Sequence, residues 1–130
     1  MRVLLLPAAL LALAVTGCAG ETRRACTLIA ATGGIEVEVA QRLAARADRA
    51  TLTACWAGSC RTGQVREFVP LSDLPAAPVR VTLRLSGPDL AVAETTRLTP
   101  EVTYPNGPGC PPETARARVR MDVTGTLRAG

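Results

Sequence analysis

Residues 79–85 read Val-Arg-Val-Thr-Leu-Arg-Leu, and residues 115–123 read Ala-Arg-Ala-Arg-Val-Arg-Met-Asp-Val. In both stretches an apolar side chain alternates with a polar one. Because successive side chains of a β-strand point to opposite faces, this alternation puts the apolar residues on one face and the arginines on the other. The two stretches therefore predict strands that are buried on one side and exposed to water on the other.

The same alternation recurs more weakly along the rest of the chain. It predicts further strands over residues 35–39, 50–54, 65–69 and 90–98, with a hairpin turn at Trp56-Ala57-Gly58-Ser59. Residues 70–78 and 105–112 are rich in proline and predict loops. Only residues 41–50 have helical character, and they lack capping residues and length.

About seven short strands predict an all-β domain, an antiparallel β-sandwich of the immunoglobulin-like type, with a small β-barrel as the alternative. The likeness to immunoglobulin domains concerns architecture alone. Trp56 directly follows Cys55, so their side chains point to opposite faces of a strand. The core tryptophan of an antibody domain instead packs against the disulfide between its sheets.

The first residues predict an export signal. Met1 and Arg2 form a short basic start, and the apolar run of residues 3–15 is too short to span a bilayer. Val15-Thr16-Gly17-Cys18 resembles the lipobox of bacterial lipoproteins, which implies cleavage before Cys18 and acylation of that cysteine, with palmitate as a typical acyl group. An ordinary secretory signal with a chance cysteine is the alternative.

We therefore expect a lipoprotein signal peptide over residues 1–17, a lipidated tether over residues 18–25 and a β-sandwich domain over residues 26–130. Lipid on Cys18 would hold the domain on the extracytoplasmic face of the cell membrane. The seven residues between Cys18 and Cys26 reach at most about 25 Å. Arg23 and Arg24 in this tether either attract anionic headgroups or belong to a solvated linker.

Four further cysteines remain once Cys18 carries lipid, and in an oxidising compartment they predict two disulfides. Three pairings are possible. We favour Cys55–Cys60, across the predicted hairpin, and Cys26–Cys110, between the start of the domain and the loop before its last strand. A zinc site is the disfavoured alternative, because no cysteine pair has knuckle spacing and the chain has no histidine.

Three segments resemble a group of small lipoproteins from GC-rich actinobacteria that has no established activity. They are Cys-Thr-Leu-Ile at residues 26–29, Cys-Trp-Ala-Gly-Ser-Cys-Arg at residues 55–61 and Tyr-Pro-Asn-Gly-Pro-Gly-Cys at residues 104–110. The resemblance covers nearly the whole mature chain. It implies the same localisation and disulfides, and it implies no catalytic residue.

The composition argues against an enzyme. The chain has neither histidine nor lysine to act as a base, and its cysteines are expected to be oxidised. Glu36 and Glu38 share a strand face about 6.7 Å apart, a spacing that inverting glycosidases use, but a polar outer face is the favoured interpretation. No phosphate loop or dinucleotide motif is present, so we expect no cofactor.

Two rows of arginines are the candidate binding residues. Arg116, Arg118 and Arg120 follow one predicted strand, and Arg80 and Arg84 follow another. If these strands are neighbours in one sheet, five guanidinium groups share a face that suits phosphate-rich wall polymers or lipid headgroups. The alternative is a solvated face paired with carboxylates.

The charge and the aromatic residues add little to this interpretation. The net charge of +4 is spread along the chain and does not form the basic stripe of a nucleic-acid-binding protein. Trp56 is favoured as a packing residue, whereas Tyr104 suits packing and ligand contact equally.

These observations predict a membrane-anchored, non-enzymatic surface lipoprotein that interacts with an envelope protein or an anionic wall polymer. One alternative is an accessory lipoprotein that captures a small ligand for a transporter or a cell-wall enzyme. Another is an enzyme inhibitor that inserts residues 105–112 into a target cleft.

Overall fold

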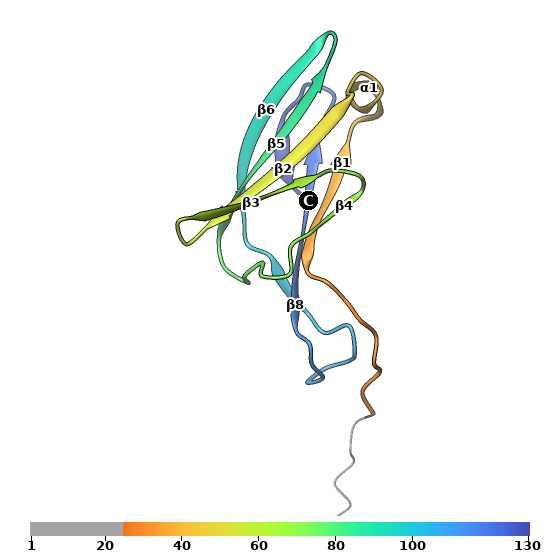
Figure 1. Cartoon of the computed structure of the whole chain (residues 1–130), viewed down its shortest axis with the longest axis vertical. Coiled ribbons are helices and arrows are strands. Elements are labelled where there is room, and N and C mark those ends of the chain that lie inside the picture. The colour runs from red at the N-terminus through yellow and green to blue at the C-terminus, as the bar shows by residue number, and fades with distance from the viewer. Residues whose placement is uncertain (1–24) are drawn as a thin grey trace, which may run out of the picture.

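The computed structural model describes residues 25–130. The predicted signal peptide, the predicted acylation site Cys18 and the expected tether up to residue 24 lie outside the described residues. Within residues 25–130 no helix is long and apolar enough to span a membrane. The described elements, shown in Figure 1, are β1 Gly34–Val39, α1 Gln41–Ala44, β2 Arg49–Trp56, β3 Ser59–Gln64, β4 Phe68–Pro70, β5 Val79–Gly87, β6 Leu90–Leu98, β7 Glu101–Thr103, β8 Thr114–Met121 and β9 Leu127–Ala129.

The strands form two sheets, which confirms the predicted β-sandwich. The first, called sheet A below, has the order β4-β1-β8-β7, with β9 also paired to β8; the second, sheet B, has the order β3-β2-β5-β6. Neighbouring strands run antiparallel except for β1 and β8, which are parallel. The described chain has nine strands where about seven were expected, and three of the nine, β4, β7 and β9, have only three residues.

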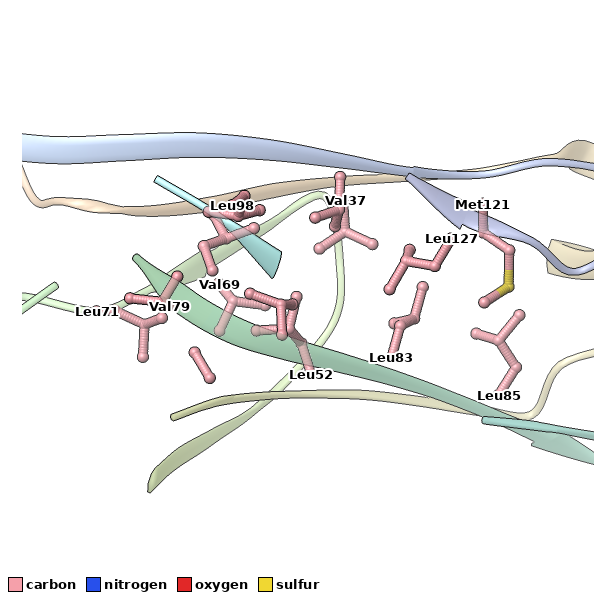
Figure 2. Packing of buried hydrophobic residues seen from close by; sticks show 14 of the residues in the cluster. Val37, Leu52, Val69, Leu71, Val79, Leu83, Leu85, Leu98, Met121 and Leu127 are labelled. Atoms are coloured by element: carbon pink, nitrogen blue, oxygen red, sulfur yellow. The ribbon is translucent and has the colours of Figure 1, made fainter. Parts of the chain in front are cut away.

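The core lies between the two sheets and consists of the apolar halves of the alternating strands. Leu83 and Leu85 of β5 point toward Met121 of β8 and Leu127 of β9 (Figure 2). Val119 of β8 is fully buried. Burial of each such side chain contributes about 1.5–3 kcal/mol, so the alternating pattern decides which face of each strand turns inward.

The hairpin from β2 to β3 turns at the predicted residues. Ala57 and Gly58 have φ of 47° and 75°, the positive values that two-residue turns of type I′ require. The turn places Cys55 opposite Cys60 and Trp56 opposite Ser59.

The expected strand over residues 65–69 is wrong in its bounds. The return strand of the hairpin is β3, which ends at Gln64, and the chain then crosses to sheet A, where β4 pairs with β1. Residues 65–67 link the two sheets, and the amide of Val65 still donates to the carbonyl of Ala50 in sheet B. A short apolar run that serves two sheets in turn resembles a single strand in the sequence.

The other predicted strands agree with the structure to within a few residues, and the strand over residues 90–98 is confirmed with the same bounds. The helical segment expected over residues 41–50 is confined to the single turn α1, and residues 49 and 50 belong to β2 instead. The strand expected over residues 115–123 ends at Met121, because Asp122 begins a turn. Residues 70–78 and 105–112 are loops apart from Pro70 itself, the last residue of β4.

Candidate functional site

Both favoured disulfides are present. Cys55 and Cys60 are directly opposed in β2 and β3, with their Cα atoms 4.1 Å apart. Cys26 and Cys110 join the segment before β1 to the loop before β8, with a Cα–Cα distance of 5.7 Å. In the described part of the chain, no three histidine, cysteine, aspartate or glutamate residues gather as a metal site would require.

The two arginine rows do not share a face. Arg116, Arg118 and Arg120 lie on β8 of sheet A, whereas Arg80 and Arg84 lie on β5 of sheet B. Both strands bury their apolar faces in the same core, so their arginines point away from each other on opposite outer surfaces. The face of five guanidinium groups that the sequence suggested is therefore absent.

The arginines of sheet A are matched by carboxylates. Glu36 and Glu38 of β1 lie in register with Arg118 and Arg120 of the parallel β8. Their carboxylates accept from these guanidinium groups at 2.6 and 2.9 Å. The hydrogen bond and the charge of Glu36 raise the pKa of Arg118 above its ordinary value. Both glutamates are thus ion-pair partners on a polar outer face.

Arg116, the third arginine of this row, lies over an aromatic ring. Its guanidinium carbon is 5.1 Å from the centre of the Phe68 ring of β4, which is within the range of a cation–π contact. Each of the three β8 arginines therefore has a partner on sheet A, a carboxylate for two of them and an aromatic ring for the third.

The outer surface of sheet B has the opposite character. Its arginines form no ion pair within residues 25–130, and none of the positions that share this surface is acidic. Glu94 of β6 is in register with the buried Leu83 and therefore belongs to the other side of the strand. We call this surface the arginine–threonine face; its members are Arg49, Thr51, Thr53, Thr62, Arg80, Thr82, Arg84, Thr95 and Arg97.

Four threonines cross this face in one row. Strand register aligns Thr62, Thr53, Thr82 and Thr95 on the four successive strands of sheet B. The hydroxyl groups pair at 2.8 Å within β2–β3 and again at 2.8 Å within β5–β6. Each pair consumes one hydroxyl proton, so one donor per pair and several acceptor lone pairs remain for a ligand. At about 4.8 Å per strand, the row extends over roughly 14 Å.

The next row brings two arginines together beside a disulfide. It contains Cys60, Cys55, Arg80 and Arg97 in that order. Arg80 and Arg97 are directly opposed across β5 and β6, and both are exposed. Like charges at directly opposed positions destabilise a sheet. Arg80 and Arg97 border a shallow hollow of about 290 Å³ beside the Cys55–Cys60 disulfide. An anion bound there would relieve the repulsion between the two guanidinium groups.

Trp56 is a packing residue, as favoured above. Its side chain is half-buried and packs against the core. The guanidinium carbon of Arg61 lies 5.7 Å from its ring centre, and Arg61 in turn pairs with Asp73 at 2.9 Å. These contacts hold the turn end of the hairpin against the loop after β4.

Sequence reasoning missed Arg97 and the threonine row. The signal for Arg97 is weak because Ala91, Ala93 and Thr95 precede it on the same side of β6, and small residues do not mark a polar face clearly. The threonine row involves four strands, so it depends on registers that no single stretch of sequence contains.

The comparisons with known proteins add no assignment, because the chain matches no protein-family model, no curated protein and no solved structure.

Proposed function

We propose that the protein is a membrane-anchored surface lipoprotein, acylated at Cys18, that binds an anionic polymer of the cell envelope through the arginine–threonine face. The observation that supports this proposal is the contrast between the two outer surfaces. Carboxylates pair with Arg118 and Arg120 of sheet A, and Arg116 lies over the Phe68 ring. Arg80, Arg84 and Arg97 of sheet B have no acidic partner within residues 25–130.

The chemistry of the face suits a polymer that carries both negative groups and hydroxyls. Guanidinium groups bind phosphate or carboxylate in a bidentate manner. The threonine hydroxyls lie between Arg80 and Arg84 along β5 and supply neutral donors and acceptors. The face is built on four paired strands, and its threonine row extends over roughly 14 Å, so an extended chain suits it.

The proposed role is non-enzymatic and uses no cofactor or metal. The anchor would keep the domain within reach of polymers at the extracytoplasmic face of the cell membrane. There, several weak contacts to one polymer chain would together raise the overall affinity. No particular contact among the described residues favours ligand capture for a transporter or inhibition of an enzyme. The lipobox and the resemblance to actinobacterial lipoproteins support the anchor.

The test compares two variants that remove the same charge from opposite surfaces. One carries Arg80→Ala, Arg84→Ala and Arg97→Ala, and its matched control carries Arg116→Ala, Arg118→Ala and Arg120→Ala. The chain, purified from membranes in detergent, is titrated with poly(glycerol phosphate) by calorimetry at roughly 50 and 200 mM salt, a range over which phosphate contacts weaken strongly.

We expect the sheet B variant to lose most of its affinity and to show a shallower salt dependence, because it lacks the unpaired guanidinium groups. The sheet A variant should bind nearly as the unsubstituted chain does. Equal losses in both variants would show that only net charge matters. Unchanged binding in the sheet B variant would reject the arginine–threonine face.

A further inference from the structure

Large apolar side chains are exposed together at one end of the molecule. Leu28 is 98% exposed, Ile29 57% and Tyr104 44%. They belong to the segment before β1 and to the loop between β7 and β8, which extend together beyond the end of the sandwich at which β8 begins (Figure 1). Val102, at 42% exposure, lies in the adjoining strand β7.

This end is a built structure. The Cys26–Cys110 disulfide joins its two segments. Asn106, which is buried, accepts hydrogen bonds from the Ile29 amide at 2.7 Å and the Thr27 hydroxyl at 3.1 Å, and donates to the Pro111 carbonyl at 3.0 Å. The exposed side chains are therefore held in place by contacts that order the backbone beneath them.

An open groove continues the apolar surface toward sheet A. Its volume is about 670 Å³, and its lining includes Ile29, Ala31, Phe68, Tyr104 and Arg116. Apolar surface next to a guanidinium group and a tyrosine is typical of the boundary between acyl chains and headgroups of a bilayer.

We infer that this end of the domain contacts the membrane, with Leu28, Ile29 and Tyr104 entering the headgroup boundary of the bilayer. The inference rests on the anchor in the proposed function. Cys18 precedes Leu28 by ten residues, and the chain enters the described structure at this same end. An acyl anchor with a reach of at most about 25 Å to Cys26 therefore keeps this end of the domain close to the lipid.

The contact would also orient the polymer-binding surface. Sheet B extends from the middle of the molecule to the β5–β6 turn, which lies at the end opposite this one (Figure 1). The arginine–threonine face would then stand on the side of the domain, open to a polymer that passes above the membrane.

Quenching by lipid tests the inference. The chain is expressed with its leader, purified from membranes and reconstituted into vesicles of phosphatidylcholine and phosphatidylglycerol with brominated acyl chains, which quench tryptophan fluorescence. Leu28→Trp reports on the proposed contact. Val123→Trp is the matched control, because Val123 is exposed by 64% and lies beyond the opposite end of β8. The unsubstituted chain, whose single tryptophan is Trp56, provides the baseline.

We expect the Leu28→Trp variant to lose much of its added fluorescence in brominated vesicles, while Val123→Trp keeps it. Mass spectrometry of the N-terminal peptide of the same samples reports acylation separately. Acylated protein with no greater quenching in Leu28→Trp than in Val123→Trp would overturn the membrane contact and leave the anchor standing. Protein without acyl groups on Cys18 would overturn the anchor and, with it, this inference.

Discussion

Asp122 ends β8 and shapes the turn into β9. One oxygen of its carboxylate accepts hydrogen bonds from the Thr124 amide at 2.9 Å and the Thr126 amide at 3.1 Å, as well as from the Thr124 hydroxyl. These donors favour the charged form, led by the Thr124 hydroxyl, and lower the pKa of Asp122. A single side chain thus satisfies several backbone groups that the end of the strand leaves without partners.

The pKa of Asp122 predicts how the stability depends on pH. Because the folded-state pKa is lower than the unfolded value of about 3.9, the carboxylate stabilises the fold above that value, and this contribution disappears as the pH falls through the folded-state pKa. We expect Asp122→Asn to lower the Tm at pH 7 and to have a smaller effect near pH 2. Circular dichroism melting curves at both pH values measure the difference.

Asp48→Asn is the control for this prediction, because the Asp48 carboxylate accepts no hydrogen bond within residues 25–130. Its Tm should change little at either pH. An equal Tm loss for Asp122→Asn at pH 7 and pH 2 would contradict a role for the charged form.

At the scale of elements, β5 and β6 carry opposed positive charges on their outer side. Arg80 and Arg97 face each other across the pair, next to the strand that carries Cys55. The same two strands are held by the Thr82–Thr95 hydroxyl pair and by the longest run of paired residues in either sheet. The extensive pairing of β5 with β6 outweighs the repulsion between the two guanidinium groups. Because neither group is used in an ion pair within residues 25–130, both are available to bind an anionic ligand.

The opposed pair predicts that stability and binding change in opposite directions. Arg97→Glu replaces repulsion with attraction and should stabilise the free protein by about 0.2–1 kcal/mol. The same change should weaken binding to poly(glycerol phosphate), because it removes one positive group and adds a negative one. Urea denaturation and calorimetric titration measure the two effects.

Arg128→Glu makes the same charge change on β9 of sheet A, where Arg128 also opposes an arginine, Arg120, but one whose charge is already paired with Glu38. This control should bind the polymer almost normally. If Arg97→Glu and Arg128→Glu weakened binding equally, the effect would come from net charge and the specific role of the opposed pair would be refuted.

At the scale of the whole molecule, the Cys26–Cys110 disulfide spans 84 residues and joins the entry of the domain to the loop before β8. In the chain-entropy model, a disulfide that closes a loop of this length raises the free energy of unfolding by about 4.5 kcal/mol. Residues 26–30 lie outside both sheets and are exposed, so without the bond this segment would fray in the folded protein. The full value is therefore an upper bound.

We expect Cys26→Ser with Cys110→Ser to lower the free energy of unfolding by less than about 4.5 kcal/mol and to speed hydrogen exchange at the Ile29 amide, which Asn106 otherwise binds. Cys55→Ser with Cys60→Ser opens a loop with a sequence separation of only 5. This second variant should lower the free energy of unfolding by about 2 kcal/mol and leave the Ile29 amide protected from hydrogen exchange. Unchanged exchange in the first variant would show that the hydrogen bonds alone hold this end.

The sequence by itself predicted the elements whose signals are local. Alternation over residues 79–85 and 115–123 predicted two strands and which side chains they bury, because period two is a property of one strand. The turn at Ala57 and Gly58 and both disulfides followed from residue types and spacing. The two-sheet architecture followed from the number of such strands and from their half-apolar character.

Only the tertiary structure decided which strands are neighbours. An outward arginine on β5 looks the same in the sequence whether β8 lies beside it or across the core. The parallel pairing of β1 with β8 joins residues 82 positions apart and gave Arg118 and Arg120 of sheet A their carboxylates. The same distribution of strands left Arg80, Arg84 and Arg97 without carboxylates in the described chain, because pairing between distant strands depends on burying all the apolar faces together.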